Sequence, residues 1–433
     1  MVVPVPVVLH EGDVKTLTKE TLTKVDQMGA PRLVEYWEED PCQQEVYPME
    51  MATMGAAPSA AMARDEKKAD KDYGVKIEAQ FTVGEYNIVI LSAKEATGLD
   101  AWLRDSHYKI PEGAERLLRP YVESGMKFFV AKVDPKKVRF ENGQAMLSPL
   151  RFHYDSEEFQ LPIRLGLANS NGTQDLIVNI LALHQRYQLA NYKNVTIPTN
   201  LDVKDDVRKR FGEFYAALFD RTIQQNPGAV VTEYAWQAMS CDPCPGPNLD
   251  YHDFATLGAD VIGDQNGDWV MTRLHARYGK SDVPNDLVFK AAPPIVGGRE
   301  IKGPSGELEH GASAAEYNNF QGRYAIRHLW NGPIACANPV RGRWSGSPPA
   351  GSQIADQGIM AATNLAFAPR GKVQLPNLVA QDVPEIDVKQ GVPLPGGAGF
   401  RNKQGCGCQG ASGTGGLLFG AVALLFMRRK KRA

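Results

Sequence analysis

The 433-residue sequence lacks the short motifs that mark the commonest catalytic sites. It contains no G-x-S-x-G motif, no H-E-x-x-H motif and no phosphate-binding loop. Eight histidines and 50 acidic residues can still assemble a site from distant parts of the chain. The sequence therefore favours a non-catalytic protein, and the alternative is an enzyme whose site is built from scattered side chains.

Acidic residues are absent from the C-terminal end. From residue 401 onward the chain holds seven of its 48 Lys and Arg residues and none of its 50 Asp and Glu residues. The preceding body then has 41 basic and 50 acidic residues, a formal net charge of −9. A body of this sign has no general electrostatic attraction to nucleic acid or to anionic lipid. We therefore expect no nucleic-acid partner.

Cysteine is scarce, with six residues in the whole chain, of which Cys42, Cys241, Cys244 and Cys336 lie in the body. In an exported protein, four widely spaced cysteines usually form two disulfides. Three pairings are open, and the spacing of the residues does not choose among them. We expect structural disulfides from these four residues.

The Cys241-Asp242-Pro243-Cys244 segment also has the spacing of a redox-active or metal-binding pair. A thiolate stabilised by a helix would need a helix to begin at Cys241, and the prolines at 245 and 247 oppose one. A zinc site would need two further ligands, and no matching pair stands at zinc-knuckle spacing. Structural disulfides are therefore favoured over both alternatives, and we expect no metal or other cofactor.

Long apolar runs are also missing, because no segment approaches the ~20 residues of an ordinary transmembrane helix. The nearest candidate is residues 417–427, followed directly by five basic residues at 428–432. Counted back to Ala411, a helix here would span about 25 Å, which is marginal for a bilayer. The basic cluster would resist translocation. We expect a C-terminal transmembrane tail and an exported body, and the alternative is a short buried helix.

This tail resembles the myxobacterial C-terminal sorting signal known as MYXO-CTERM, in which a cysteine motif, a short transmembrane helix and an Arg-rich end follow in order. The matching parts are Cys406 and Cys408 between glycines, residues 417–427 and residues 428–432. The resemblance implies that a sorting protease cuts near the cysteines and that the product goes to the cell surface. It also implies lipidation of Cys406 or Cys408.

Composition divides the chain into three parts. We expect a globular body over residues 1–390 with a solvated insertion at about 51–72, a Gly-rich linker with the cysteine motif at 391–416, and the transmembrane segment with its basic end at 417–433. Residues 2–9 are too short and too rich in proline for a signal peptide, and their pattern indicates an edge strand. We therefore expect the natural start, with an export signal, to lie upstream of Met1.

The body is predicted to be α+β, with a mixed, mostly antiparallel sheet and a few helices. Alternating apolar residues predict a hairpin over residues 75–91 that turns at Gly84. Helical patterns cover 97–106 and 112–124, and an amphipathic helix over 203–218 places Val203, Val207, Phe211, Phe214 and Leu218 on one stripe. Further strands are expected at 127–133, 144–154, 159–168, 175–183, 229–239, 269–278, 287–292 and 323–330.

Two predicted strands carry basic side chains that suggest a binding patch. Arg273, His275 and Arg277 share one face of the first strand, and Arg323 and Arg327 share one face of the second. If the two strands were neighbours, the five groups would suit a carboxylate or phosphate ligand on an otherwise acidic body. The simpler interpretation, which we favour, is a solvated strand face paired with nearby carboxylates.

Residues 264–268 alternate oxygen-bearing side chains in the manner of a calcium loop. The rest of such a loop and its distal Glu are missing. An Asn-Gly pair directly before a strand is the expected signal of a hairpin turn. We therefore expect a turn here.

Several segments of the body resemble an uncharacterised bacterial family, domain of unknown function 2330. They are residues 1–9, 30–37, 81–93, 125–133, 241–245 and 269–278, so the likeness extends to about residue 345. The resemblance implies an exported or envelope protein and no known activity. The expected function is a surface- or envelope-anchored protein with a binding or structural role and an unidentified envelope ligand. The alternative is an exported hydrolase acting on an envelope polymer.

Overall fold

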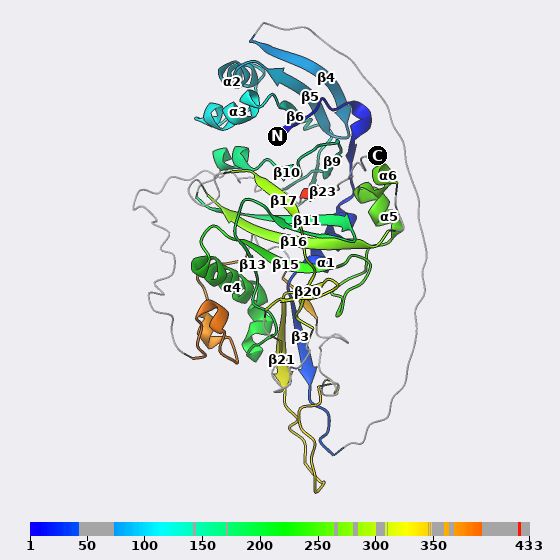
Figure 1. Ribbon diagram of the computed structural model, residues 1–433, viewed down its shortest axis with the longest axis vertical. Helices are drawn as coiled ribbons and strands as arrows, with labels where there is room; N and C mark the ends of the chain where they lie inside the picture. The colour runs from blue at the N-terminus through cyan, green and yellow to red at the C-terminus, as the bar shows by residue number, and fades with distance from the viewer. Residues whose placement is uncertain are drawn as a thin grey trace.

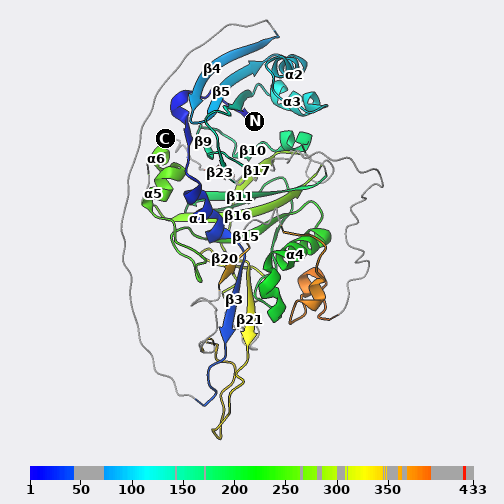
Figure 2. The ribbon, with the colours of Figure 1, turned by 180° about the vertical axis from the view of Figure 1, so that it is seen from behind.

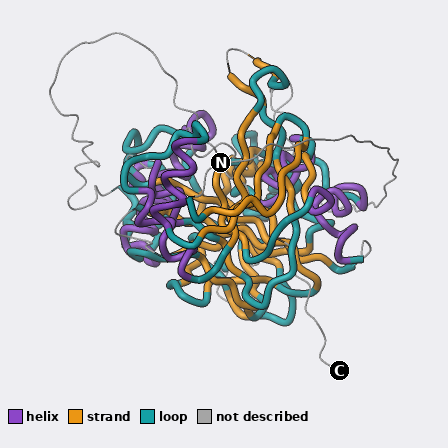
Figure 3. Tube along the Cα trace, turned by 90° about the horizontal axis from the view of Figure 1, so that it is seen from above, coloured by secondary structure: helices purple, strands orange, loops and turns teal. Residues whose placement is uncertain are grey.

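The computed structural model describes residues 1–42, 73–141, 144–169, 172–263, 267–279, 285–299, 308–309, 311–344, 346, 348, 359–362, 368–391 and 423–425. This part of the chain is α+β, with mostly antiparallel sheets and a few helices, as predicted. Seen from above, the strands occupy the middle of the molecule and the helices lie toward its outside (Figure 3).

One antiparallel sheet lies at the upper end of Figure 1 and contains strands in the order β1-β6-β5-β4. Its hairpin turns at Gly84, whose φ of 56° favours glycine. Two helices pack on the sheet through Leu99, Leu103 and Leu118. The sequence predicted the hairpin, the edge strand β1 and both helices. The elements are β1 (Val2–Val5), β4 (Val75–Val83), β5 (Tyr86–Ala93), β6 (Lys127–Val133), α2 (Ala96–Asp105) and α3 (Ala114–Glu123).

The central sheet has the order β19-β18-β20-β15-β16-β11-β23, and β13 pairs with β15. Its longest pairing joins β11 and β16 over their full lengths. Successive side chains point to opposite faces, and most of them are buried in both strands because both faces of the sheet are covered. The strands are β11 (Gln174–Leu183), β13 (Asn194–Thr196), β15 (Val230–Gln237), β16 (Trp269–Tyr278), β18 (Ile295–Gly297), β19 (Ser313–Ala314), β20 (Asn319–Gln321) and β23 (Ala423–Leu425).

Each face of the central sheet is covered by a different layer. Helices α1 (Lys19–Gly29) and α4 (Phe211–Gln225) lie on one face, where Val25 packs near Met271 and Phe219 stacks on His275. On the other face lies a small sheet with the order β10-β17-β12, which packs through residues such as Leu189. Its strands are β10 (Gln160–Leu161), β12 (Arg186–Leu189) and β17 (Leu287–Ala292).

A narrow projection, which we call the finger, extends from the lower end of the molecule (Figures 1 and 2). It consists of β3 (Arg32–Trp37), β21 (Arg323–His328) and the loops 38–42 and 329–344 that continue them. β3 and β21 are parallel and are flanked by β22 (Met360–Ala361) and β14 (Leu201–Asp202). A disulfide between Cys42 and Cys336 joins the two loops.

The remaining elements show where sequence patterns were misleading. The strand expected at 144–154 is divided between β8 (Gln144–Met146) and β9 (Leu150–Phe152), because each pairs with a different partner, β7 (Arg139–Glu141) and β2 (Val14–Thr16). The strand expected at 159–168 is wrong beyond β10, since the 3-10 helix η2 (Arg164–Asn169) follows. Short helical turns elsewhere are η1 (Glu11–Asp13), α5 (Tyr251–Phe254), η4 (Ala255–Ala259), α6 (Asp260–Ile262) and η6 (Leu375–Asn377).

The predicted amphipathic helix is confirmed, with a 3-10 start. η3 (Asp205–Arg210) leads into α4, and the whole predicted stripe is buried. The insertion at 51–72, Cys406, Cys408 and most of the 417–433 tail lie outside the described residues. Of that tail, the structure describes only the short strand β23, parallel to β11. Within the described ranges, no helix has the length and apolar character needed to span a bilayer.

Candidate functional site

A network of buried charged side chains lies between the central sheet and its helices. Glu233 of β15 is fully buried at its centre. One carboxylate oxygen contacts His275 Nδ1 at 2.6 Å and accepts a hydrogen bond from the Tyr215 hydroxyl at 2.6 Å. The other accepts from Arg273 Nε at 2.8 Å, and Arg273 also donates to Asp26 of α1 at 2.7 Å. The Glu233 carboxylate thus joins β15 to β16 and α4, and Arg273 extends the network to α1.

The network continues from His275 toward the surface. His275 Nε2 lies 3.2 Å from Asp175 Oδ1, which also accepts from Arg277 Nε at 3.0 Å. Arg277 contacts Asp220 at 2.6 Å, and Arg370 contacts both Asp175 and Asp220. Arg273 and Arg277 are therefore each paired with carboxylates, and so is His275.

Burial and charge pairing set the ionisation of the network. Burial alone would raise the pKa of Glu233, but the charges of His275 and Arg273 and their hydrogen bonds outweigh it and lower this pKa to about 2. Burial would likewise lower the pKa of His275, but Glu233 and Asp175 outweigh it and raise the pKa above its ordinary value of 6.5. The network thus favours a charged histidine held between carboxylates.

These shifts predict a stability maximum at mildly acidic pH. The contribution of Glu233 is complete above its ordinary pKa of 4.5 and is lost as pH falls toward about 2. The contribution of His275 to stability is complete below pH 6.5 and is lost as pH rises through the raised pKa of this histidine. The melting temperature should therefore be highest between about pH 4.5 and pH 6.5. The His275→Gln variant should lose the decline on the alkaline side, and an unchanged alkaline decline in that variant would contradict the assignment.

The five residues predicted to form a basic patch are not brought together. β16 is hydrogen-bonded to β11 and β15, whereas β21 is hydrogen-bonded to β14 and β3 in another sheet. The predicted patch required these two strands to be neighbours in one sheet, and they lie in different sheets. Arg323 lies over the Tyr36 ring at 5.5 Å, and Arg327 donates to Asp202 at 2.8 Å. The favoured interpretation expected a solvated strand face paired with carboxylates. The basic side chains of β16 do pair with carboxylates, but Arg273 and His275 are buried and not solvated.

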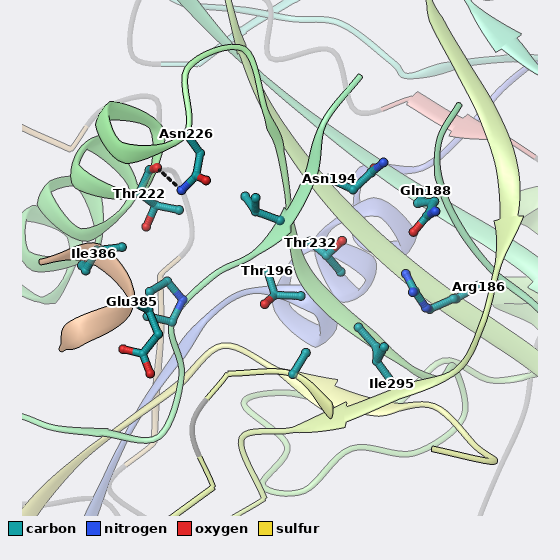
Figure 4. A pocket seen from close by; sticks show the side chains of 13 residues that line it. Arg186, Gln188, Asn194, Thr196, Thr222, Asn226, Thr232, Ile295, Glu385 and Ile386 are labelled. Atoms are coloured by element: carbon teal, nitrogen blue, oxygen red, sulfur yellow. Dashed lines mark hydrogen bonds between the residues drawn. The ribbon is translucent and has the colours of Figure 1, made fainter. Parts of the chain in front are cut away.

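A separate pocket with a volume of about 450 Å³ opens between β12, β13, β15, the C-terminal end of α4 and the 3-10 helix η7 (Pro384–Ile386). Figure 4 shows Arg186 on one side of it, Thr222, Asn226 and Glu385 on the opposite side, and Thr196 and Thr232 between them. A volume of this size accommodates a small organic molecule.

Arg186 is the unusual residue of this pocket. Its side chain is 7% exposed, and its Nε donates to the Pro293 carbonyl. Among the residues that the structure describes, no carboxylate pairs with it, and its two terminal nitrogens, which line the pocket, make no hydrogen bond. Burial lowers the pKa of Arg186 to about 10, so the group is still charged at neutral pH. A buried charge without a counter-ion is costly, which is typical of a site that binds an anion.

Three further side chains present hydrogen-bonding groups beside Arg186. They are the Gln188 amide and the hydroxyls of Thr196 and Thr232, which make no side-chain hydrogen bond within the described part of the chain. By contrast, the Asn194 amide is occupied, because it bonds the backbone of Leu189 on both sides. Sequence reasoning missed this site, because an arginine and a few hydroxyls on short strands produce no recognisable spacing.

The cysteines of the body form two disulfides, Cys42–Cys336 and Cys241–Cys244. This is one of the three pairings that the sequence left open. The buried Arg32 donates to the Pro243 carbonyl at 2.7 Å and so holds the short 241–244 loop. Residues 264–266 of the expected turn lie outside the described part. Within the described part, no three His, Cys, Asp or Glu side chains are grouped so as to hold a metal ion.

Comparison with known proteins identifies the family of the chain. A family model described as an uncharacterized protein conserved in bacteria, DUF2330, matches residues 1–290. No curated protein and no solved structure matches the chain significantly. The match covers β1 through β16 and includes Arg186, Glu233 and His275. The chain therefore belongs to the DUF2330 family of bacterial proteins.

Proposed function

We propose that this is an exported, envelope-anchored protein that binds a small ligand without transforming it, in the pocket at Arg186. The observation that carries the proposal is the largely buried Arg186, whose guanidinium is paired with no carboxylate of the described residues, since a folded protein gains no stability from such a charge. A ligand that compensates its charge explains why the pocket contains it. The pocket is also of ordinary ligand-binding size.

The chemistry of the pocket supports binding over hydrolysis. No histidine or cysteine is among the described residues that line it, so the lining offers no cysteine nucleophile and no histidine base. The histidine that does meet several carboxylates, His275, is 2% exposed and stacked on Phe219 at 3.6 Å. Its ring nitrogens are both engaged by Glu233 and Asp175. An exported hydrolase built on these groups would need a substrate to reach a closed interior.

Two features support export and anchoring. The pairing of all four body cysteines in disulfides is typical of proteins that fold in an oxidising compartment. The basic cluster at 428–432 behind the apolar residues 417–427 is the pattern of a membrane anchor. In this proposal the tail gives up the pairing of β23 with β11 and meets the membrane, and a sorting protease acts at Cys406 or Cys408.

Deletion of residues 417–432 tests the location. We expect the truncated protein in the periplasm or medium, because the segment that would contact lipid is gone, while the full chain sediments with membranes. Fractionation with antibody detection measures this. The matched control replaces the basic residues 428–432 with glutamines and keeps the apolar run. Recovery of the truncated protein in the membrane fraction would count against anchoring by the tail.

The released protein also tests the binding role. Small molecules extracted from it after denaturation should include a compound that mass spectrometry does not find in the Arg186→Gln variant. An equal set of compounds from both proteins would reject the pocket as the ligand site, whatever the location of the protein.

A further inference from the structure

The Cys241–Cys244 disulfide lies in an irregular loop that is held by other contacts as well. Arg32 of β3 donates to the Pro243 carbonyl at 2.7 Å, and Gln321 of β20 donates to the Asp242 carbonyl at 2.6 Å. Both donor side chains are fully buried, so they fix the loop to the body of the protein. The two cysteines, in contrast, are partly exposed. The disulfide can therefore open while the loop stays in place, and reagents can approach it from solvent.

The arginine that contacts this loop is a cation without a counter-ion. The Arg32 guanidinium is 0% exposed, and no carboxylate of the described residues pairs with it. Its Nη2 donates to the carbonyls of Met28 and Ala30, and its Nε makes no hydrogen bond within the described part of the chain. Burial lowers the pKa of Arg32 to about 10, so the group is charged at neutral pH. A disulfide is neutral, but opening it produces a thiolate that supplies the missing negative charge.

We propose that Cys241–Cys244 is a thiol–disulfide exchange site that oxidises protein dithiols in flexible segments, which can reach a partly exposed pair. A substrate thiolate attacks Cys241 Sγ, the bond between the two sulfurs of the loop breaks, and its electron pair goes to Cys244 Sγ. The second substrate thiol loses its proton to solvent and attacks the substrate sulfur of this mixed disulfide. The electron pair of the broken bond then leaves on Cys241 Sγ, which takes up a proton.

These two steps oxidise the substrate dithiol by two electrons and reduce the loop disulfide to a dithiol. A disulfide of the surrounding compartment, on a small molecule or on another protein, regenerates the loop disulfide by the same steps in reverse. The inference is independent of the pocket at Arg186, so the failure of one leaves the other standing.

The contact with Arg32 decides which sulfur leaves. The Pro243 carbonyl belongs to the peptide bond that leads to Cys244, so the cation lies at the residue next to this cysteine. A nearby cation lowers the pKa of a thiol, and a thiol of lower pKa is the better leaving group. Asn248 supports the reduced pair, because its Oδ1 lies 3.1 Å from Cys241 Sγ and 3.2 Å from Cys244 Sγ and can accept from a thiol. We therefore assign the attack to Cys241.

The Cys42–Cys336 disulfide provides a comparison within the same molecule. The Cys42 N–H donates to Asp40 Oδ1 at 2.8 Å, and a negative charge at this distance disfavours a thiolate. Arg343 donates to the Asp40 carbonyl, but it is already paired with Glu39. This disulfide also closes a far longer loop than Cys241–Cys244 does, so more of the fold depends on it. We expect it to stay closed where the short loop opens.

Equilibration of the full chain with glutathione buffers at neutral pH tests the electrostatic step. Alkylation and peptide mass spectrometry give, for each pair, the value of [GSH]²/[GSSG] at which half is reduced. This value should be at least about tenfold lower for Cys241–Cys244 than for Cys42–Cys336. Arg32→Met should raise it by about tenfold, and Arg32→Lys should recover part of that change, because the lysine keeps the charge. Equal values for the two disulfides would overturn the proposal.

The exposed Asp242 gives a test that does not disturb the interior. Asp242→Asn removes an anion from between the cysteines, so it should lower the half-reduction value by about twofold to fivefold, opposite to Arg32→Met. The matched control is Asp206→Asn, which should leave the value unchanged. A merely structural role of the loop contacts would shift Arg32→Met and Asp242→Asn in the same direction. No shift in Asp242→Asn would overturn the charge argument even where Arg32→Met fails to fold.

A short peptide with two cysteines tests the exchange itself. The reduced peptide should become a disulfide as Cys241–Cys244 is reduced, one for one, and the Cys241→Ser, Cys244→Ser variant should leave it reduced. With the oxidised peptide, the Cys244→Ser variant should form a stable mixed disulfide on Cys241, which mass spectrometry identifies. A peptide that stays reduced beside the wild type would overturn the activity. An adduct on Cys244 of the Cys241→Ser variant, with none on Cys241, would overturn the assignment of the attacked sulfur.

Discussion

Replacing Glu233 with glutamine is expected to lower the free energy of unfolding by about 3–5 kcal/mol. Both carboxylate oxygens are used, and the side chains of Arg273, His275 and Tyr215 that surround them are almost fully buried. Glutamine keeps the shape but removes the charge, and it turns one acceptor into a donor that faces other donors. Arg273 then keeps one carboxylate partner, Asp26, in place of two.

Urea denaturation of Glu233→Gln beside two reference variants measures this effect. The first is Asp206→Asn, which breaks an exposed ion pair with Arg210 and should cost at most about 0.5 kcal/mol. The second combines Glu233→Gln with Arg273→Met. This double variant should recover part of the loss, since it removes the cation left with a single partner. A cost for Glu233→Gln no larger than that for Asp206→Asn would show that the network contributes little to stability.

The network shows what local sequence patterns can and cannot predict. The alternation along β16 correctly placed Arg273, His275 and Arg277 on one face, because side-chain direction depends only on neighbouring residues of the strand. The carboxylates that pair with them come from other elements, Glu233 from β15 and Asp175 from β11. No local rule states which strands become neighbours. The face was therefore predicted, and its burial was not.

Element prediction succeeded where the periodicity was long and uninterrupted. The β4–β5 hairpin, β6, β16, β17 and the stripe of α4 were all predicted, since each has a sustained apolar period. β12 and β13, which carry much of the pocket, are only a few residues long and have no such signal. Arg186 and Thr196 lie on these strands. The candidate site was therefore missed because it is assembled by tertiary pairing from strands too short to recognise.

The Cys42–Cys336 disulfide is expected to contribute far more to stability than Cys241–Cys244. The first pair is separated by 294 residues and the second by three. In the chain-entropy model, closing the long loop stabilises by about 6 kcal/mol and closing the short one by about 2 kcal/mol, since the constraint on the unfolded chain grows with loop length. Double serine substitutions at each pair, compared by urea denaturation, measure the difference. Similar losses of unfolding free energy in the two double variants would contradict the larger contribution expected of Cys42–Cys336.

The finger gives the same disulfide a local role. Leu329, Ile334 and Val340 are 65%, 46% and 55% exposed, so the loop 329–344 buries little apolar surface of its own. Polar contacts hold it instead, above all the buried Glu38, which accepts two hydrogen bonds from Arg341 at 2.8 and 2.6 Å. Without the disulfide, this loop should open before the body unfolds. Hydrogen exchange should therefore accelerate in 329–344 of the Cys42→Ser, Cys336→Ser variant while β16 keeps its protection. Uniform acceleration along the chain would mean that the disulfide stabilises only the whole fold.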